Sequence, residues 1–99
     1  MDLQNKKVLV FGTGISGIAA AQLLKRMGAC PVLFDGNATL KKEDIYEKLG
    51  ESETELYLGE LPGEVIEQLS LVVLSPGVPT DLPLVNTLRE RGLRIWGEI

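Results

Sequence analysis

Short apolar segments alternate along the chain with segments whose apolar residues recur every three to four positions. Continuous apolar runs are typical of strands inside a parallel sheet, and the wider spacing is typical of helices with one buried face. Strands are predicted at residues 7–11, 31–35, 55–59, 71–74 and 94–97. Helices are predicted at about 18–27, 39–49, 62–69 and 84–91. This alternation predicts an α/β domain with a five-stranded parallel sheet flanked by about four helices.

The first predicted helix carries small and apolar residues on one face, at the spacing i, i+3, i+4, i+7. The residues predicted to face the sheet are Gly17, Ala20, Ala21, Leu24 and Met27.

The first strand runs directly into the motif G-x-G-x-x-G at residues 12–17, and the helix follows at once. Gly12 allows a tight turn, Gly14 leaves room for a phosphate near the backbone, and Gly17 lets the helix approach the strand. N–H groups at a helix start are free to bind an anion. The motif in this setting predicts a Rossmann-like fold with a phosphate site. The alternative is a turn that only permits close packing of strand and helix.

Asp35 ends the second predicted strand, close to the position where dinucleotide sites place an acidic residue. There it can accept a hydrogen bond from a ribose hydroxyl or from a nucleobase N–H. The alternative is an aspartate that only forms the turn with Gly36 and Asn37.

A proline-rich loop, Ser-Pro-Gly-Val-Pro at residues 75–79, follows the fourth predicted strand. If that strand pairs with the first, the strand order reverses there, and Gly77 is expected opposite the glycine turn. The loop would then form one wall of a ligand site. The alternative is a rigid connection to the next helix.

The composition excludes several classes of site. The net charge is −4 and the 10 basic residues are scattered, which argues against a nucleic-acid partner. With no histidine, one cysteine and no close carboxylate cluster, no metal site is predicted. Cys30 precedes an apolar strand and is expected to be buried or half-buried.

The N-terminal residues lack the apolar segment of a signal peptide, and no apolar run is long enough to span a bilayer. We therefore expect a soluble, cytoplasmic protein with no membrane partner.

Together with the ending Gly97-Glu98-Ile99, these motifs resemble the N-terminal domain of the Mur ligases of peptidoglycan synthesis. Within that family they are most similar to the ligases that add D-glutamate to UDP-N-acetylmuramoyl-L-alanine. The resemblance covers nearly the whole chain and rests on the glycine turn, Asp35, the Ser-Pro-Gly loop and the ending.

The resemblance implies that this domain holds the UDP part of UDP-N-acetylmuramoyl-L-alanine. It places the pyrophosphate at the glycine turn, the uracil beside Asp35, and the Ser-Pro-Gly loop along the nucleotide. The residues implied to bind UDP are Gly14, Ile15, Ser16, Gly17, Asp35, Gly36, Asn37, Ser75 and Gly77.

The resemblance also implies that ATP and Mg²⁺ bind to a central domain and the amino acid to a C-terminal domain. Residues 1–99 contain no G-x-x-x-x-G-K-[S/T] motif, so we expect one UDP-binding domain with those two domains absent from this chain. No catalytic residue, metal or cofactor is expected within it, and alone it should bind without catalysing.

Two other interpretations use the same glycines and Asp35. One is a non-catalytic Rossmann domain that senses NAD or another nucleotide, and the other is a fragment of an NAD dehydrogenase.

Overall fold

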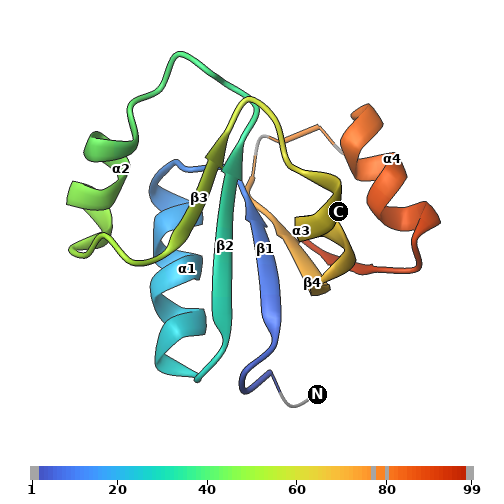
Figure 1. The fold of residues 1–99 in the computed structure, drawn as a ribbon, viewed down its shortest axis with the longest axis horizontal. Coiled ribbons are helices and arrows are strands. Elements are labelled where there is room, and N and C mark those ends of the chain that lie inside the picture. The colour runs from blue at the N-terminus through green and yellow to red at the C-terminus, as the bar shows by residue number, and fades with distance from the viewer. Residues whose placement is uncertain (1–2, 77, 80, 98–99) are drawn as a thin grey trace.

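The computed structural model describes residues 3–76, 78–79 and 81–97, and these residues form the predicted alternation of strand and helix (Figure 1). The strands are β1 (Lys7–Phe11), β2 (Cys30–Asp35), β3 (Glu55–Leu58), β4 (Leu69–Leu74) and β5 (Arg94–Trp96). The helices are α1 (Ile15–Arg26), α2 (Lys42–Leu49), α3 (Gly63–Glu67) and α4 (Pro83–Glu90). The Rossmann-like fold class is confirmed.

The sheet has the order β3-β2-β1-β4-β5, and all its neighbouring strands are parallel. β1 lies in the centre, and its register with β4 runs from Val8↔Leu71 to Phe11↔Leu74. The fourth strand therefore pairs with the first, which was the condition for the strand order to reverse beside β1. The carboxyl ends of the strands lie at the top of Figure 1, where α1 begins.

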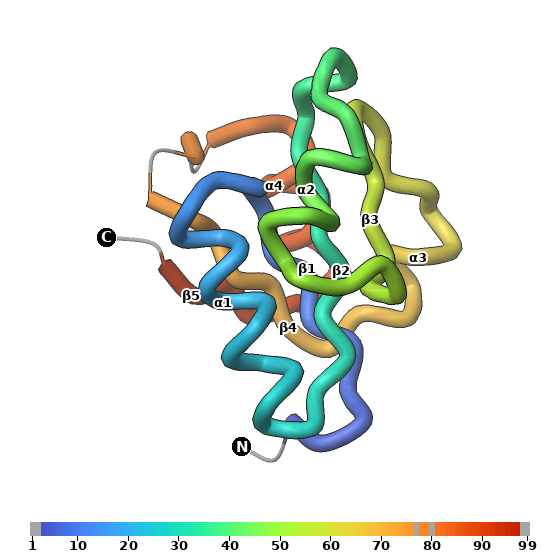
Figure 2. Tube along the Cα trace, turned by 90° about the vertical axis from the view of Figure 1, so that its left-hand side faces the viewer, coloured from blue at the N-terminus to red at the C-terminus, as the bar shows by residue number. Residues whose placement is uncertain are grey.

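Both faces of the sheet are covered, which explains the continuous apolar runs in its central strands β1, β2 and β4. Val8 and Val10 point to the face under α1 and α2, whereas Leu9 and Phe11 point to the face under α3 and α4. Figure 2 shows α1 and α2 next to each other on the first face. Among the described residues, no helix has the length and apolar character needed to cross a membrane.

The second helix begins at Lys42, three residues later than predicted. The side-chain oxygen of Asn37 accepts hydrogen bonds from the Thr39 N–H at 3.0 Å and the Thr39 hydroxyl at 2.5 Å. This turn offers the backbone an alternative to the first helical turn, so the helix starts after it.

The fourth strand begins at Leu69, two residues earlier than predicted, and α3 is correspondingly short. Lys7 pairs with Leu69 but Val8 pairs with Leu71, which leaves Ser70 as an extra residue in β4. The exposed Ser70 interrupts the apolar pattern, and the strand continues through it as a bulge.

Two burial predictions were wrong. Met27 is 52% exposed because α1 ends at Arg26, and Ile18 contributes to the buried face instead. Cys30 is exposed because it is the first residue of β2, where its side chain borders a surface hollow beside Lys25.

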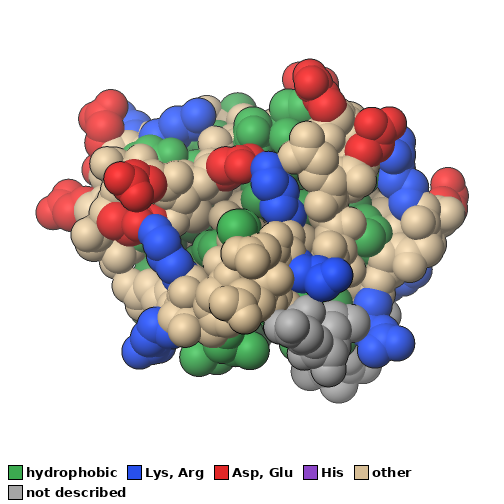
Figure 3. Space-filling model, turned by 60° about the horizontal axis from the view of Figure 1, so that its bottom comes forward, with side chains coloured by type: hydrophobic (Ala, Val, Ile, Leu, Met, Phe, Trp, Pro, Cys, Tyr) green, Lys and Arg blue, Asp and Glu red, His purple; other side chains and the backbone are tan. Residues whose placement is uncertain are grey.

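Lys7 connects β1 to the start of β3 and to the end of α3, at the edge of the sheet where the strands begin. This edge lies opposite the glycine turn. The Lys7 ammonium donates to Glu55 Oε1 at 2.9 Å and to Gln68 Oε1 at 2.8 Å. The hydrogen bond to Glu55 raises the pKa of Lys7, and burial together with Glu55 raises the pKa of Tyr57. Figure 3 shows this end, with acidic and basic side chains interspersed among apolar ones.

Candidate functional site

The glycine turn connects the end of β1 to the start of α1. Gly12 has φ of +112°, and its N–H donates to the Phe34 carbonyl at 2.7 Å. Gly14 is the N-cap of α1, in an extended conformation, and no side chain caps the helix start. The first turn also contains no acidic residue. The amides that follow Gly14 are therefore available to an anion at the carboxyl end of the sheet.

Close contacts hold this turn in place. A Cβ atom on Gly17 would lie 1.9 Å from the Gly12 carbonyl oxygen, and one on Gly12 would lie 2.9 Å from Ser75 Oγ. A Cβ atom on Gly14, in contrast, would have no atom within 4 Å. The structure thus supports the separate reasons predicted for the glycines: Gly17 allows close packing, and Gly14 faces open space.

Asp35 links the glycine turn to the loop after β2. Its Oδ2 accepts hydrogen bonds from the Thr13 N–H at 3.1 Å and from Thr13 Oγ1 at 2.9 Å. Its Oδ1 accepts one from the Asn37 N–H at 3.0 Å. Asp35 therefore forms a turn with Asn37 and also fixes the glycine turn, and its contact with a ligand stays a prediction.

Thr13 is a site residue that the sequence reasoning missed. It is 5% exposed and one of two buried polar residues among those the structure describes. In the sequence, only its position between Gly12 and Gly14 indicates that Thr13 belongs to the site. That position does not show that its side chain contacts Asp35.

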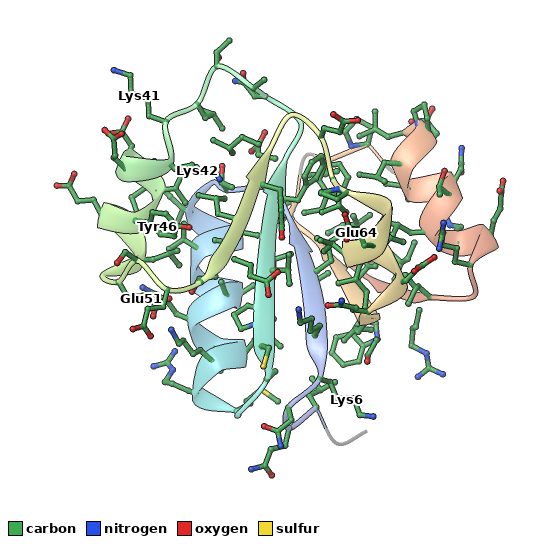
Figure 4. The ribbon with its side chains drawn as sticks, viewed as in Figure 1. Lys6, Lys41, Lys42, Tyr46, Glu51 and Glu64 are labelled. Atoms are coloured by element: carbon green, nitrogen blue, oxygen red, sulfur yellow. The ribbon has the colours of Figure 1, made fainter. Side chains whose placement is uncertain are left out.

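A cleft of about 330 Å³ lies between the glycine turn and α2. Leu40 and Ile45 give it an apolar part, and its charged lining residues are two lysines and two aspartates. Figure 4 shows Lys41 before α2, at the same end as the carboxyl ends of the strands, with its side chain directed outward. The full lining is Thr13, Gly14, Asp35, Asn37, Leu40, Lys41, Asp44, Ile45 and Lys48.

Three of the predicted site residues, Gly14, Asp35 and Asn37, line this cleft. Ile15 and Ser16 follow Gly14 at the start of α1, and both are exposed, Ile15 to 93%.

The remaining predicted residues have different surroundings. Gly36 is exposed between Asp35 and Asn37. Gly17 is buried beneath the turn, and Ser75 Oγ is buried there without a hydrogen-bond partner among the described residues. Gly77 lies outside the described residues.

A larger hollow of about 420 Å³ lies elsewhere, between α1 and the segment before β3. It contains Lys25, whose ammonium forms an ion pair with Glu51, and Gln22, which donates to the Leu49 carbonyl. None of the predicted site residues lines it. We therefore assign the site to the smaller cleft, which is lined by the N-cap residue of α1, Gly14, and by Asp35.

Within residues 3–97, leaving aside 77 and 80, no group of three or more histidine, cysteine, aspartate or glutamate side chains could hold a metal ion.

Residues 6–97 match the family model described as Mur ligase MurD-like, N-terminal domain. The chain belongs to this family. The MurD-like domain is 46% identical over 99 residues to the UDP-N-acetylmuramoylalanine–D-glutamate ligase of Lachnospira eligens. It is 45% identical over 100 residues to the enzyme of the same name from Lachnoclostridium phytofermentans. Both matches cover 100% of this chain, which spans 22% of the length of each relative.

Solved structures of lower identity resemble the MurD-like domain in fold. Shikimate dehydrogenase from Aquifex aeolicus has a TM-score of 0.64 at 19% identity, covering 96% of this chain and 43% of its own. SirC, a precorrin-2 dehydrogenase, has a TM-score of 0.53 at 18% identity, covering 95% of this chain and 45% of its own. These likenesses support the Rossmann-like fold alone.

Replacing Gly17 by alanine should destabilise the MurD-like domain by about 2 to 4 kcal/mol, because the new methyl group meets the Gly12 carbonyl oxygen. Urea unfolding measures the change. Gly63→Ala is the control, since a Cβ on Gly63 meets nothing within 4 Å. Equal stability of the two variants would contradict the close approach.

Replacing Ser75 by alanine should leave the free energy of unfolding within about 1 kcal/mol of the wild type, or raise it, because the buried hydroxyl has no hydrogen-bond partner among the described residues. Thermal unfolding checks this. A substantial loss of stability would mean that the hydroxyl makes a hydrogen bond that the structure does not show.

Proposed function

We propose that this MurD-like domain binds the UDP part of UDP-N-acetylmuramoyl-L-alanine for a ligase that adds D-glutamate to it. The single observation that carries the proposal is the convergence of an uncapped helix start and a fixed carboxylate on one cleft, beside the reversal of strand order. Open α/β sheets bind their ligands at that place. The names of the relatives supply the substrate class.

The glycine turn is the proposed pyrophosphate site. The backbone amides of Ile15 and Ser16 and the Ser16 hydroxyl would donate to the phosphate oxygens. Open space at Gly14 lets the anion approach the backbone, and no acidic side chain in the first helical turn repels it. Lys41 and Lys48 line the cleft together with the carboxylates of Asp35 and Asp44, so the backbone amides are the proposed source of the attraction for the anion.

The loop after β2 is the proposed uracil site. Uracil presents one ring N–H between two carbonyl groups. The Asp35 carboxylate would accept from that N–H, and the backbone of Gly36 and Asn37 would lie along the base edge. In this proposal the loop that begins at Ser75 forms the wall beyond the glycine turn.

The catalytic steps are proposed to take place outside residues 1–99. We place the sites for ATP and Mg²⁺ in other parts of the ligase, because the sequence of this chain has no phosphate-binding G-x-x-x-x-G-K-[S/T] motif. We assign it the task of holding the nucleotide while other parts of the ligase join D-glutamate to the bound substrate. Since the one cysteine has no partner in the chain, a reducing cytoplasmic setting fits the proposal.

Replacing Asp35 by alanine should weaken the binding of both UDP and uridine by about 1.5 to 3 kcal/mol, because a hydrogen bond to a charged group is lost at the base. Calorimetric titration measures both affinities, and an unfolding curve confirms that the variant is folded. Glu64→Ala removes an exposed carboxylate on α3 and should change neither affinity. Unchanged UDP binding in the Asp35 variant would leave Asp35 as a turn residue only.

Replacing Gly14 by valine should weaken UDP binding at least about tenfold while uridine binding stays the same, because the added side chain enters the space assigned to the pyrophosphate. Gly63→Val is the matched control. The same calorimetric titration applies. A folded Gly14 variant with normal UDP affinity would refute this position for the pyrophosphate.

A further inference from the structure

Thr13 donates two hydrogen bonds to the carboxylate on which the proposed uracil site depends. We propose that Thr13 determines which ligand Asp35 can bind. Its two donors occupy the acceptor positions of Oδ2, which a ribose diol would need. One acceptor position remains on Oδ1, and it suits a single N–H of the ligand. The inference rests on the proposed function, in which Asp35 faces a bound nucleotide.

The Asp35 carboxylate can accept only a limited number of hydrogen bonds. An ionised carboxylate offers about four acceptor positions, two on each oxygen. On Asp35, Oδ2 already accepts from the Thr13 N–H and from Thr13 Oγ1, and Oδ1 accepts from the Asn37 N–H. One position on Oδ1 is left for a ligand.

These donors are held in place. Thr13 is 5% exposed, so its hydroxyl would lose a hydrogen bond without gaining water if it turned away from Asp35. The Asn37 backbone is held by its own turn, in which the Asn37 side chain accepts from Thr39. The carboxylate is therefore fixed with Oδ2 toward the glycine turn.

This arrangement discriminates between two classes of nucleotide. The uracil edge brings one N–H to the carboxylate, which matches the one open position. In dinucleotide sites the acid at the end of the second strand accepts from the ribose instead. The adenosine ribose of NAD carries two neighbouring hydroxyls, and a carboxylate that accepts from both needs an open position on each oxygen. Here Oδ2 has none.

Thr13→Val tests the inference because valine keeps the side-chain volume and the backbone N–H but removes the hydroxyl donor. Oδ2 then gains an open position, so each oxygen of Asp35 has one. Thr13→Ser keeps the hydroxyl and is the matched control. Thr13→Ala removes the hydroxyl with a smaller side chain and serves as the second variant if the valine variant does not fold.

The experiment measures the dissociation constants of UDP and ADP-ribose for the wild type and the variants by calorimetry, with unfolding curves to confirm folding. We expect the preference for UDP over ADP-ribose to fall about tenfold in Thr13→Val, the equivalent of one hydrogen bond. Thr13→Ala should shift in the same direction, and Thr13→Ser should keep the wild-type preference.

Two results would overturn the inference: a Thr13→Val domain that gains no affinity for ADP-ribose relative to UDP, or a Thr13→Ser domain that shifts with it. A wild-type domain that does not bind UDP would overturn the proposed function instead. In that case the ADP-ribose affinities of the valine and serine variants still decide the role of the hydroxyl.

Discussion

The start of α1 lies so close to the end of β1 that no side-chain atom fits between them. A Cβ atom on Gly17 would be 1.9 Å from the Gly12 carbonyl oxygen, and Ser75 of the neighbouring strand end packs against the same turn. This approach fixes the position and direction of α1 on the sheet. It places the uncapped amides of the helix at the reversal of strand order, where a ligand can reach them. Without it, the helix would sit further from the sheet and its amides would point elsewhere.

A second constraint ties the two ends of the site together. The Asp35 carboxylate accepts from both donors of Thr13 and from the Asn37 N–H, so the glycine turn and the loop after β2 form one rigid surface. In the proposed function, one end of this surface takes the pyrophosphate and the other the base. A ligand that contacts both ends gains from a geometry already set in the free domain, which reduces the entropy lost on binding.

The sequence predicted the elements with strong periodicity and the positions governed by glycine. The close packing at Gly17 and the open space at Gly14 follow from the motif and its context, whereas the pairing of β4 with β1 was only one possibility until the structure showed it. Thr13 could not be predicted, because its role depends on a carboxylate 22 residues away in the chain. The late start of α2 depends on a side-chain turn at Asn37, and the bulge at Ser70 depends on register between strands. The choice of UDP over NAD came from the resemblance to the Mur ligases, since the glycines and Asp35 alone suit either ligand.

The central claim is that the glycine turn and the loop after β2 bind one UDP molecule together. Nuclear magnetic resonance of the ¹⁵N-labelled domain, titrated with UDP and separately with NAD, tests it most directly. The account predicts that UDP moves the amide signals of residues 14–17 and 35–37 in parallel, with one dissociation constant, and that NAD moves them less at equal concentration. The proposed joint binding of UDP would be contradicted if NAD moved the signals of these two segments and UDP did not.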